Sequence, residues 1–109
     1  MKKLNFKKSQ HPKPSETLSD EAKRWWRSIV EEFQVDDSAG VLLLQSALES
    51  FDDMRRAQAI LAKEGMTIVD RWGQQKQHPA TLVLRDSRNL MLRCLKQLNL
   101  DIVPGSPLT

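Results

Sequence analysis

The strongest constraint on the fold is a regular helical spacing of apolar residues in the middle of the chain. Residues on one repeating face are spaced by 4, 3, 4, 3 and 4: Leu43, Ala47, Ser50, Met54, Ala57 and Leu61. We call the five apolar members, all but Ser50, the seam. This spacing keeps them on one side of an α-helix, as in a coiled coil. Because residues 36–40 supply a helix start and Gly65 a helix stop, a helix over 38–64 is predicted, with the seam packing either inside the chain or between subunits.

Two shorter helices are predicted on either side of it. Ser19 is a typical N-cap followed by two acids, and an apolar stripe then continues to Phe33, so a helix over 19–34 is expected. Trp25 and Trp26 lie on that stripe and are predicted to anchor the core rather than to stack on bases. His78 and Pro79 begin the last helix, over 79–98, with the His78 imidazole either capping its start or bonding to the preceding loop. Cys94 lies on the apolar face of this helix and is expected to be a small core residue.

The segment between the second and third helices has a different character. Residues 66–77 combine a β-branched stretch with a turn and a polar run, which predicts a loop or a small two-stranded β-ribbon around Gly73. Trp72 is expected to pack on the core rather than to lie at an exposed partner surface. The predicted fold is therefore mainly α, with three principal helices in one domain over 16–100 and a short C-terminal tail over 101–109.

Charge is distributed unevenly along the chain. The first 15 residues hold no acid and are predicted to form a flexible basic arm with the lysines Lys2, Lys3, Lys7, Lys8 and Lys13. Since the whole chain has 17 basic and 14 acidic residues, the arm carries +5 and the remainder −2. Such an arm can bind phosphates, or it can be merely a solubilising terminus.

The last helix is predicted to carry a second basic feature. Its outer side has four cations, with only Asp86 to compensate them: Arg85, Arg88, Arg93 and Lys96. This face is interpreted either as a contact for DNA or an acidic partner, or as an ordinary solvated surface.

Several classes of protein are disfavoured by the residues that the chain lacks. No GxxxxGK[ST], GxGxxG or GxSxG string occurs, so an enzyme of these classes is not expected. Two separated histidines and a single cysteine exclude the usual zinc frameworks, and no metal site or cofactor is expected. No run of 18 apolar residues is present, and the N-terminus has no apolar signal-peptide core, which favours an intracellular protein without a membrane span.

The order of these signals resembles that of the phage terminase small subunits. The resemblance covers residues 18–100. Its first half depends on the Leu18–Lys23 helix start with Trp25 or Trp26 and on the acid of the Asp36–Asp37 break. Its second half depends on the Ala57–Gly65 segment and on a leucine-rich stretch over 95–100. The spacing of Gly65, Gly73, His78 and Pro79 is its most specific part. Members of that family usually have glycine where Asn99 stands, followed by Leu-Thr-Pro and an arginine, which this chain does not have.

The resemblance implies a non-enzymatic packaging factor of a phage or prophage, in the host cytoplasm. Such proteins bind double-stranded phage DNA, assemble into homo-oligomeric rings and recruit or regulate the large terminase subunit, which holds the ATPase and nuclease. By this resemblance the seam would supply ring contacts, and the arm and the basic helix face would supply phosphate contacts. Two alternatives remain open from the residues alone: a small helical transcriptional regulator that uses Arg88 and Asn89 to read bases, and a helix-binding interaction module.

Overall fold

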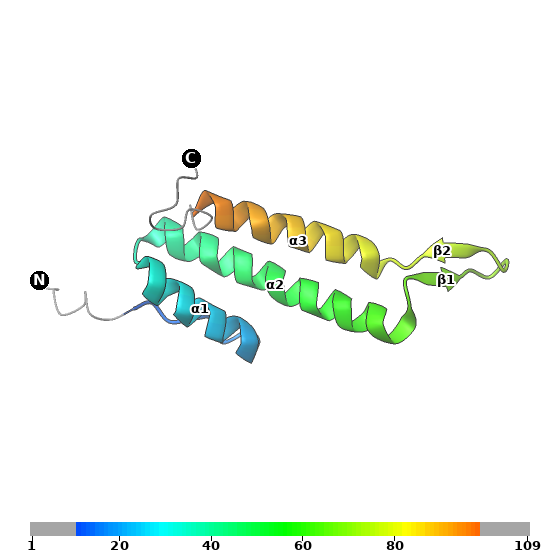
Figure 1. Ribbon diagram of the computed structural model, residues 1–109, viewed down its shortest axis with the longest axis horizontal. Helices are drawn as coiled ribbons and strands as arrows, with labels where there is room; N and C mark the ends of the chain where they lie inside the picture. Colours follow the sequence, from blue (N-terminus) through cyan, green and yellow to red (C-terminus); the bar gives the residue numbers. More distant parts are fainter. Residues whose placement is uncertain (1–10, 99–109) are drawn as a thin grey trace, which may run out of the picture.

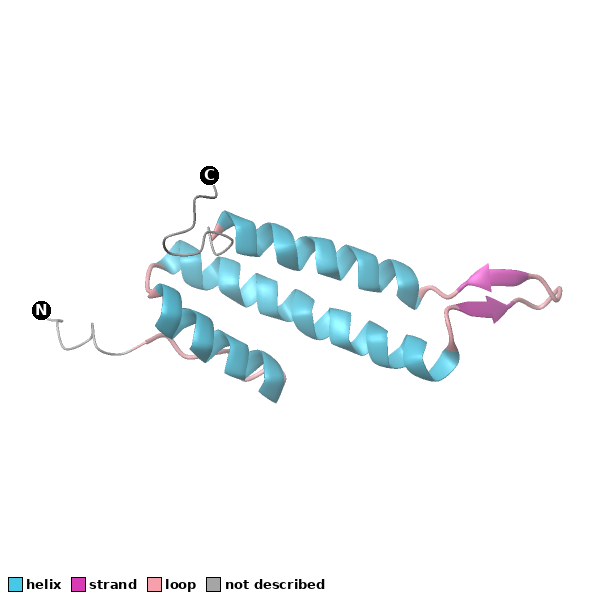
Figure 2. Ribbon diagram, viewed as in Figure 1, coloured by secondary structure: helices cyan, strands magenta, loops and turns pink. Residues whose placement is uncertain are grey.

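The computed structural model describes residues 11–98 as three α-helices and one β-hairpin (Figures 1 and 2). The helices are α1 (Asp20–Phe33), α2 (Ser38–Glu64) and α3 (Ala80–Gln97). α3 runs antiparallel along α2, and α1 lies beside the N-terminal half of α2 (Figure 1). This arrangement confirms the predicted fold class. Lys2, Lys3, Lys7, Lys8, Asn99 and the tail over 101–109 lie outside the described residues.

The helix ends follow the predicted capping chemistry. The Ser19 side chain accepts a hydrogen bond of 3.0 Å from the Ala22 N–H, which satisfies a free amide in the first turn of α1. Asp37 does the same for α2, accepting from the Gly40 N–H at 3.0 Å. α2 ends at Gly65, whose φ of 86° is a conformation that residues with a β-carbon rarely adopt.

The helices differ in length, so α1 covers only the N-terminal half of α2. α2 has 27 residues and is about 40 Å long, whereas α1 has 14 residues and is about half that length. Beyond the start of α1, only α2 and α3 remain side by side, and they lead into the hairpin (Figure 2). Its strands are β1 (Thr67–Val69) and β2 (Gln75–Gln77), which pair antiparallel with Ile68 opposite Lys76.

The core lies where all three helices meet. Its largest fully buried side chains are Trp26 and Val30 of α1 and Leu44 of α2, and Met91 of α3 packs against their cluster. Cys94 is also buried, as predicted. Burying these apolar side chains is the main source of stability for so small a domain.

A segment predicted to be flexible is packed against the core. The Trp26 indole N–H donates a 2.9 Å hydrogen bond to the Pro12 carbonyl, and Pro12, Pro14 and Ser15 are half-buried. A buried indole N–H requires such a partner, so the core tryptophan fixes the chain that precedes α1. The last residues of the expected arm over 1–15 therefore belong to the folded body.

Two of the predictions for tryptophans are wrong. Trp25 is 49% exposed, because its neighbour Trp26 occupies the centre of the apolar stripe and leaves Trp25 at its edge. Trp72 is 70% exposed, because it lies at the tip of the hairpin, which extends away from the helices and brings no core surface within its reach (Figure 1).

A buried carboxylate connects the first two helices. Asp52 of α2 is 6% exposed. Its Oδ2 accepts a 2.8 Å hydrogen bond from the Ser19 N–H, and its Oδ1 accepts one of 2.5 Å from the Ser19 hydroxyl. The same serine caps α1, so Asp52 fixes the position of the α1 N-terminus on α2.

Candidate nucleic-acid interface

The outer side of α3 presents four cations. Arg85, Arg88, Arg93 and Lys96 are all exposed. Arg85 lies 3.2 Å from the Asp86 carboxylate, whereas Arg88, Arg93 and Lys96 form no ion pair with any residue of the 11–98 range. An exposed pair such as Arg85–Asp86 is weak, and it leaves most of the positive potential of this face intact.

The burial of the opposite side of α3 explains why the cations face outward. Ala80, Ser87 and Cys94 are buried, and Leu84 and Met91 pack against the core. Their spacing of three and four residues fixes the rotation of the helix, so the cations between them must point to solvent. The basic surface thus follows from the apolar stripe of the same helix.

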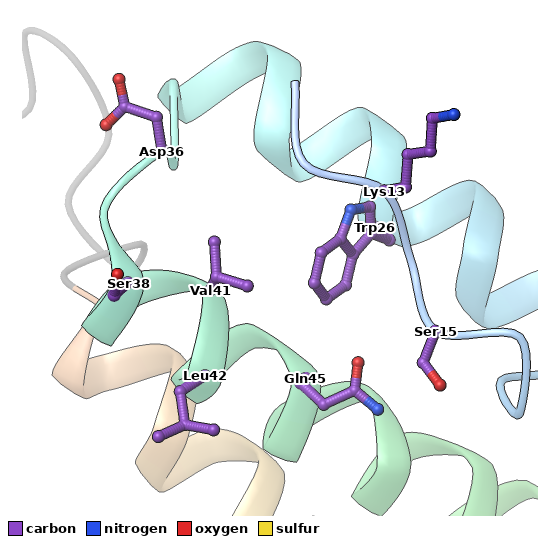
Figure 3. Close-up of a pocket in the computed structure, with 8 residues that line it drawn as sticks. All are labelled: Lys13, Ser15, Trp26, Asp36, Ser38, Val41, Leu42 and Gln45. Carbon is purple, nitrogen blue, oxygen red and sulfur yellow. The ribbon is translucent and has the colours of Figure 1, made fainter. Parts of the chain in front are cut away.

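Lys13 is the one lysine of the predicted arm within residues 11–98, and it lies beside α1 and α2 rather than beside α3. Lys13 is exposed beside an open depression of about 530 Å³, whose other lining residues include Asp36 and Gln45. Figure 3 shows Lys13 and Ser15 on the N-terminal segment, Trp26 on α1, and Val41, Leu42 and Gln45 on α2. Ser15 and Ser38 line the depression together with Asp36, and the Ser15 hydroxyl is hydrogen-bonded to the Thr17 hydroxyl at 2.8 Å. Within residues 11–98 no three metal-ligating side chains are clustered.

The residues of the predicted family motif surround the hairpin. Gly65 ends α2, Gly73 lies in the turn with φ 81°, and His78 and Pro79 precede α3. Of the two contacts considered from sequence, the His78 side chain makes the cap, since its Nδ1 accepts from the Ala80 N–H at 3.0 Å. Its Nε2 lies 2.7 Å from a carboxylate oxygen of Glu64, which is the last residue of α2 and not part of the loop. The histidine therefore caps α3 and connects it to the end of α2.

The hairpin carries exposed residues that the sequence reasoning did not assign to a site. Arg71 stacks on Trp72, with its guanidinium carbon 4.7 Å from the ring centre. Val69 and Met66 are also well exposed. An Asp-Arg-Trp-Gly turn between two short strands was the signal that could have identified this tip as a surface feature, since a tight turn points its central side chains away from the strands.

Three of the five seam residues are buried within the single chain. Ala47, Met54 and Ala57 are buried, and Leu43 and Leu61 are half-buried. The single chain therefore covers the middle of the seam, whereas Leu43 and Leu61 at its two ends keep part of their surface accessible.

A mostly apolar groove lies between α1 and α3. It measures about 440 Å³ and is lined by Trp25, Phe51, Met91 and Leu95 among others, with Glu32 its one charged lining residue. This groove explains where the exposed face of Trp25 points.

The comparisons with known proteins agree with this architecture. A family model described as "Phage terminase, small subunit" matches residues 22–106, which is most of the chain. Neither a curated protein nor a solved structure gives a significant match. None of the described helices combines the length and apolarity needed to cross a membrane. Since the family match includes the three helices and the hairpin, the chain belongs to the phage terminase small-subunit family.

Proposed function

We propose that this chain is a non-catalytic DNA-packaging factor that binds double-stranded phage DNA in the host cytoplasm and recruits or regulates the large terminase subunit. Its family membership supports the packaging role. The observation that carries the DNA-binding part is the exposed outer face of α3, where three cations have no ion-pair partner within residues 11–98.

The dimensions of this face suit a duplex. Arg85 and Lys96 are 11 positions apart on α3, which corresponds to about 17 Å along the helix axis. The major groove of B-DNA is about 12 Å wide, so cations along this face can reach phosphates on both of its edges. Phosphate contacts of this kind fix the position of a protein without reading the sequence.

The salt dependence of binding tests this assignment. Each neutralised phosphate contributes about 0.9 to the slope of log K against log [salt] on duplex DNA. The triple variant Arg88→Gln, Arg93→Gln, Lys96→Gln is therefore expected to lower the slope by about 2.7 if all three contact phosphate. Fluorescence anisotropy with a labelled random-sequence duplex measures the slope over a range of NaCl concentrations.

A charge-matched variant provides the control. Arg27, Arg56 and Lys63 are exposed on α1 and α2, and changing all three to glutamine alters the net charge by the same amount. The control is expected to bind with a slope close to that of the unmodified chain. Equal slopes for both triple variants would remove α3 from the DNA interface.

Assembly and recruitment belong to the same proposal. Because Ala47, Met54 and Ala57 of the seam are already buried within the chain, we propose that ring formation uses another surface. Light scattering of the purified chain reports the subunit number. Capture of the purified large subunit on immobilised chain tests recruitment. ATP hydrolysis or DNA cleavage by the isolated chain would contradict the non-catalytic role.

A further inference from the structure

We propose that the β1–β2 hairpin is a second DNA-contacting element, which enters a groove of the duplex with Arg71, Trp72 and the glutamines of its second strand. This inference rests on the proposed DNA binding, but it assigns a separate element with a different kind of contact. Four observations support it: the rigidity of the tip, its exposed aromatic side chain, the chemistry of its outward groups and its position next to the basic face of α3.

The tip of the hairpin is held in one conformation. Asp70 Oδ1 accepts hydrogen bonds from the backbone N–H groups of Trp72 at 2.8 Å and Gln74 at 2.9 Å. The Asp70 N–H donates to the Gln74 carbonyl at 2.9 Å, and the Gly73 N–H donates to the Asp70 carbonyl at 3.0 Å. At the base of the hairpin, the His78 N–H donates to the Met66 carbonyl at 2.8 Å. An ordered tip loses less conformational entropy on binding than a mobile loop does.

The ordered tip presents an aromatic side chain that residues 11–98 leave largely uncovered. Trp72 is 70% exposed, and the Arg71 guanidinium stacks on its ring. A tight turn of this type needs glycine and aspartate but no tryptophan, so the turn itself does not account for Trp72. An aromatic or apolar side chain beside an arginine suits contact with the bases and backbone of a nucleic acid groove.

The outward chemistry of the hairpin favours DNA over a protein partner. Its only acid, Asp70, is turned inward, with Oδ2 3.7 Å from the Lys76 ammonium and otherwise unpartnered. The remaining polar side chains of the turn and second strand are all exposed and carry hydrogen-bond donors: Arg71, Gln74, Gln75, Lys76 and Gln77. Glutamine and arginine pair with base edges, and a two-stranded ribbon fits the major groove. Tryptophan and arginine are enriched in protein–protein interfaces as well, whereas lysine is depleted there, so the glutamines and Lys76 are the residues that favour DNA.

The position of the hairpin fits a continuous contact. The hairpin extends from the end of the α2–α3 pair at which α3 begins, and Arg85 lies in the second turn of α3 (Figure 1). One duplex can therefore meet the basic face and the hairpin of the same chain.

Two substitutions separate the expected contacts. Trp72→Ala in the full chain is expected to weaken binding to a random-sequence 30-base-pair duplex about tenfold with an unchanged salt slope, because an apolar contact releases no counterions. Arg71→Gln is expected to lower the slope by about 0.9. Leu42→Ala and Arg56→Gln are the matched controls, since both residues are exposed on α2 away from the hairpin.

A second pair of variants tests the order of the tip at constant charge. Asp70→Asn keeps an acceptor oxygen for the two backbone N–H groups, whereas Asp70→Ala removes it, and both lose the same negative charge. The proposal expects Asp70→Ala to bind the duplex several-fold more weakly than Asp70→Asn. Circular dichroism of each variant verifies that the helices are intact.

The outcomes distinguish this inference from the proposed function. Unchanged DNA affinity of Trp72→Ala together with loss of large-subunit capture would make the hairpin a protein-docking element and overturn the inference, while the α3 assignment stands. Equal DNA affinities for the two Asp70 variants would overturn it as well. If the unmodified chain binds no duplex at low salt, the proposed function fails and this inference fails with it.

Discussion

The Asp52 carboxylate gives the sharpest prediction about how the fold is held together. Asp52→Ala removes both hydrogen bonds to Ser19, and with them the connection between the α1 N-terminus and α2. The serine then still caps its own helix through Ala22, so the loss is confined to the contact between helices.

The expected loss of unfolding free energy follows from the surroundings of Asp52 and Ser19. A hydrogen bond to a charged acceptor contributes about 1.5–3 kcal/mol, and here there are two. Two effects reduce this loss. Ser19 is exposed, so water can accept the hydrogen bonds that its N–H and hydroxyl no longer donate to Asp52. In addition, alanine does not carry the desolvation cost of a buried carboxylate. We therefore expect Asp52→Ala to lower the free energy of unfolding by about 2–3 kcal/mol, which corresponds to a fall in Tm of about 10–20 °C.

The assay is thermal and urea unfolding followed by circular dichroism at one fixed protein concentration, since assembly would otherwise shift the apparent stability. Asp53→Ala is the matched control. Asp53 is the next residue of α2, it is exposed, and its partner Arg56 is on the surface, so its loss is expected to cost at most about 1 kcal/mol. Both substitutions have the same effect on helix propensity.

A double-mutant cycle completes the test. Ser19→Ala and Asp52→Ala are expected to be coupled by about 1–2 kcal/mol, because each removes the partner of the other. Independent effects of the two substitutions, or equal stabilities of the Asp52 and Asp53 variants, would refute the role of this carboxylate.

Three further substitutions probe other parts of the fold. Met54→Asp places an unpaired charge at a position that is 7% exposed and is expected to unfold the domain; a variant that retains its far-UV circular dichroism and its native mass would show that this position is neither core nor interface. Gly65→Ala is expected to cost about 1–2 kcal/mol in urea unfolding through backbone strain alone, because φ is 86° and no atom lies within 4 Å of the added β-carbon. His78→Ala is expected to lower the free energy of unfolding by about 1 kcal/mol, because the Ala80 N–H loses its acceptor. The same change is expected to lower amide-exchange protection in the first turn of α3, and His78→Asn is expected to retain part of that protection.

The local patterns in the sequence predicted most of the secondary structure. Ser19, the acid-rich break before α2, Gly65 and His78 each act through neighbours within a few residues, so their chemistry is visible in the sequence. The apolar stripe of α3 also determines that its cations face outward. Hence the basic face, the core role of Cys94 and the ribbon around Gly73 are all predictable from the amino-acid sequence.

The remaining features depend on which surfaces meet. The periodicity of the seam was equally consistent with burial within one chain and burial between subunits, and only the packed helices place Ala47 and Met54 inside. The contact of Asp52 with Ser19 spans 33 positions, so no local pattern identifies it. Trp25 lies at the edge of the apolar stripe of α1, and the packing of the helices leaves that edge exposed while it buries Trp26.

The sequence by itself therefore determined where the helices begin and end and which face of each is apolar, because these properties depend on interactions between near neighbours. Only the tertiary structure decided that Trp72 stands exposed on an ordered hairpin and that Ala47, Met54 and Ala57 of the seam are buried within one chain. The physical reason is that burial depends on the distance between segments that are far apart in the chain, and that distance is set when the helices pack.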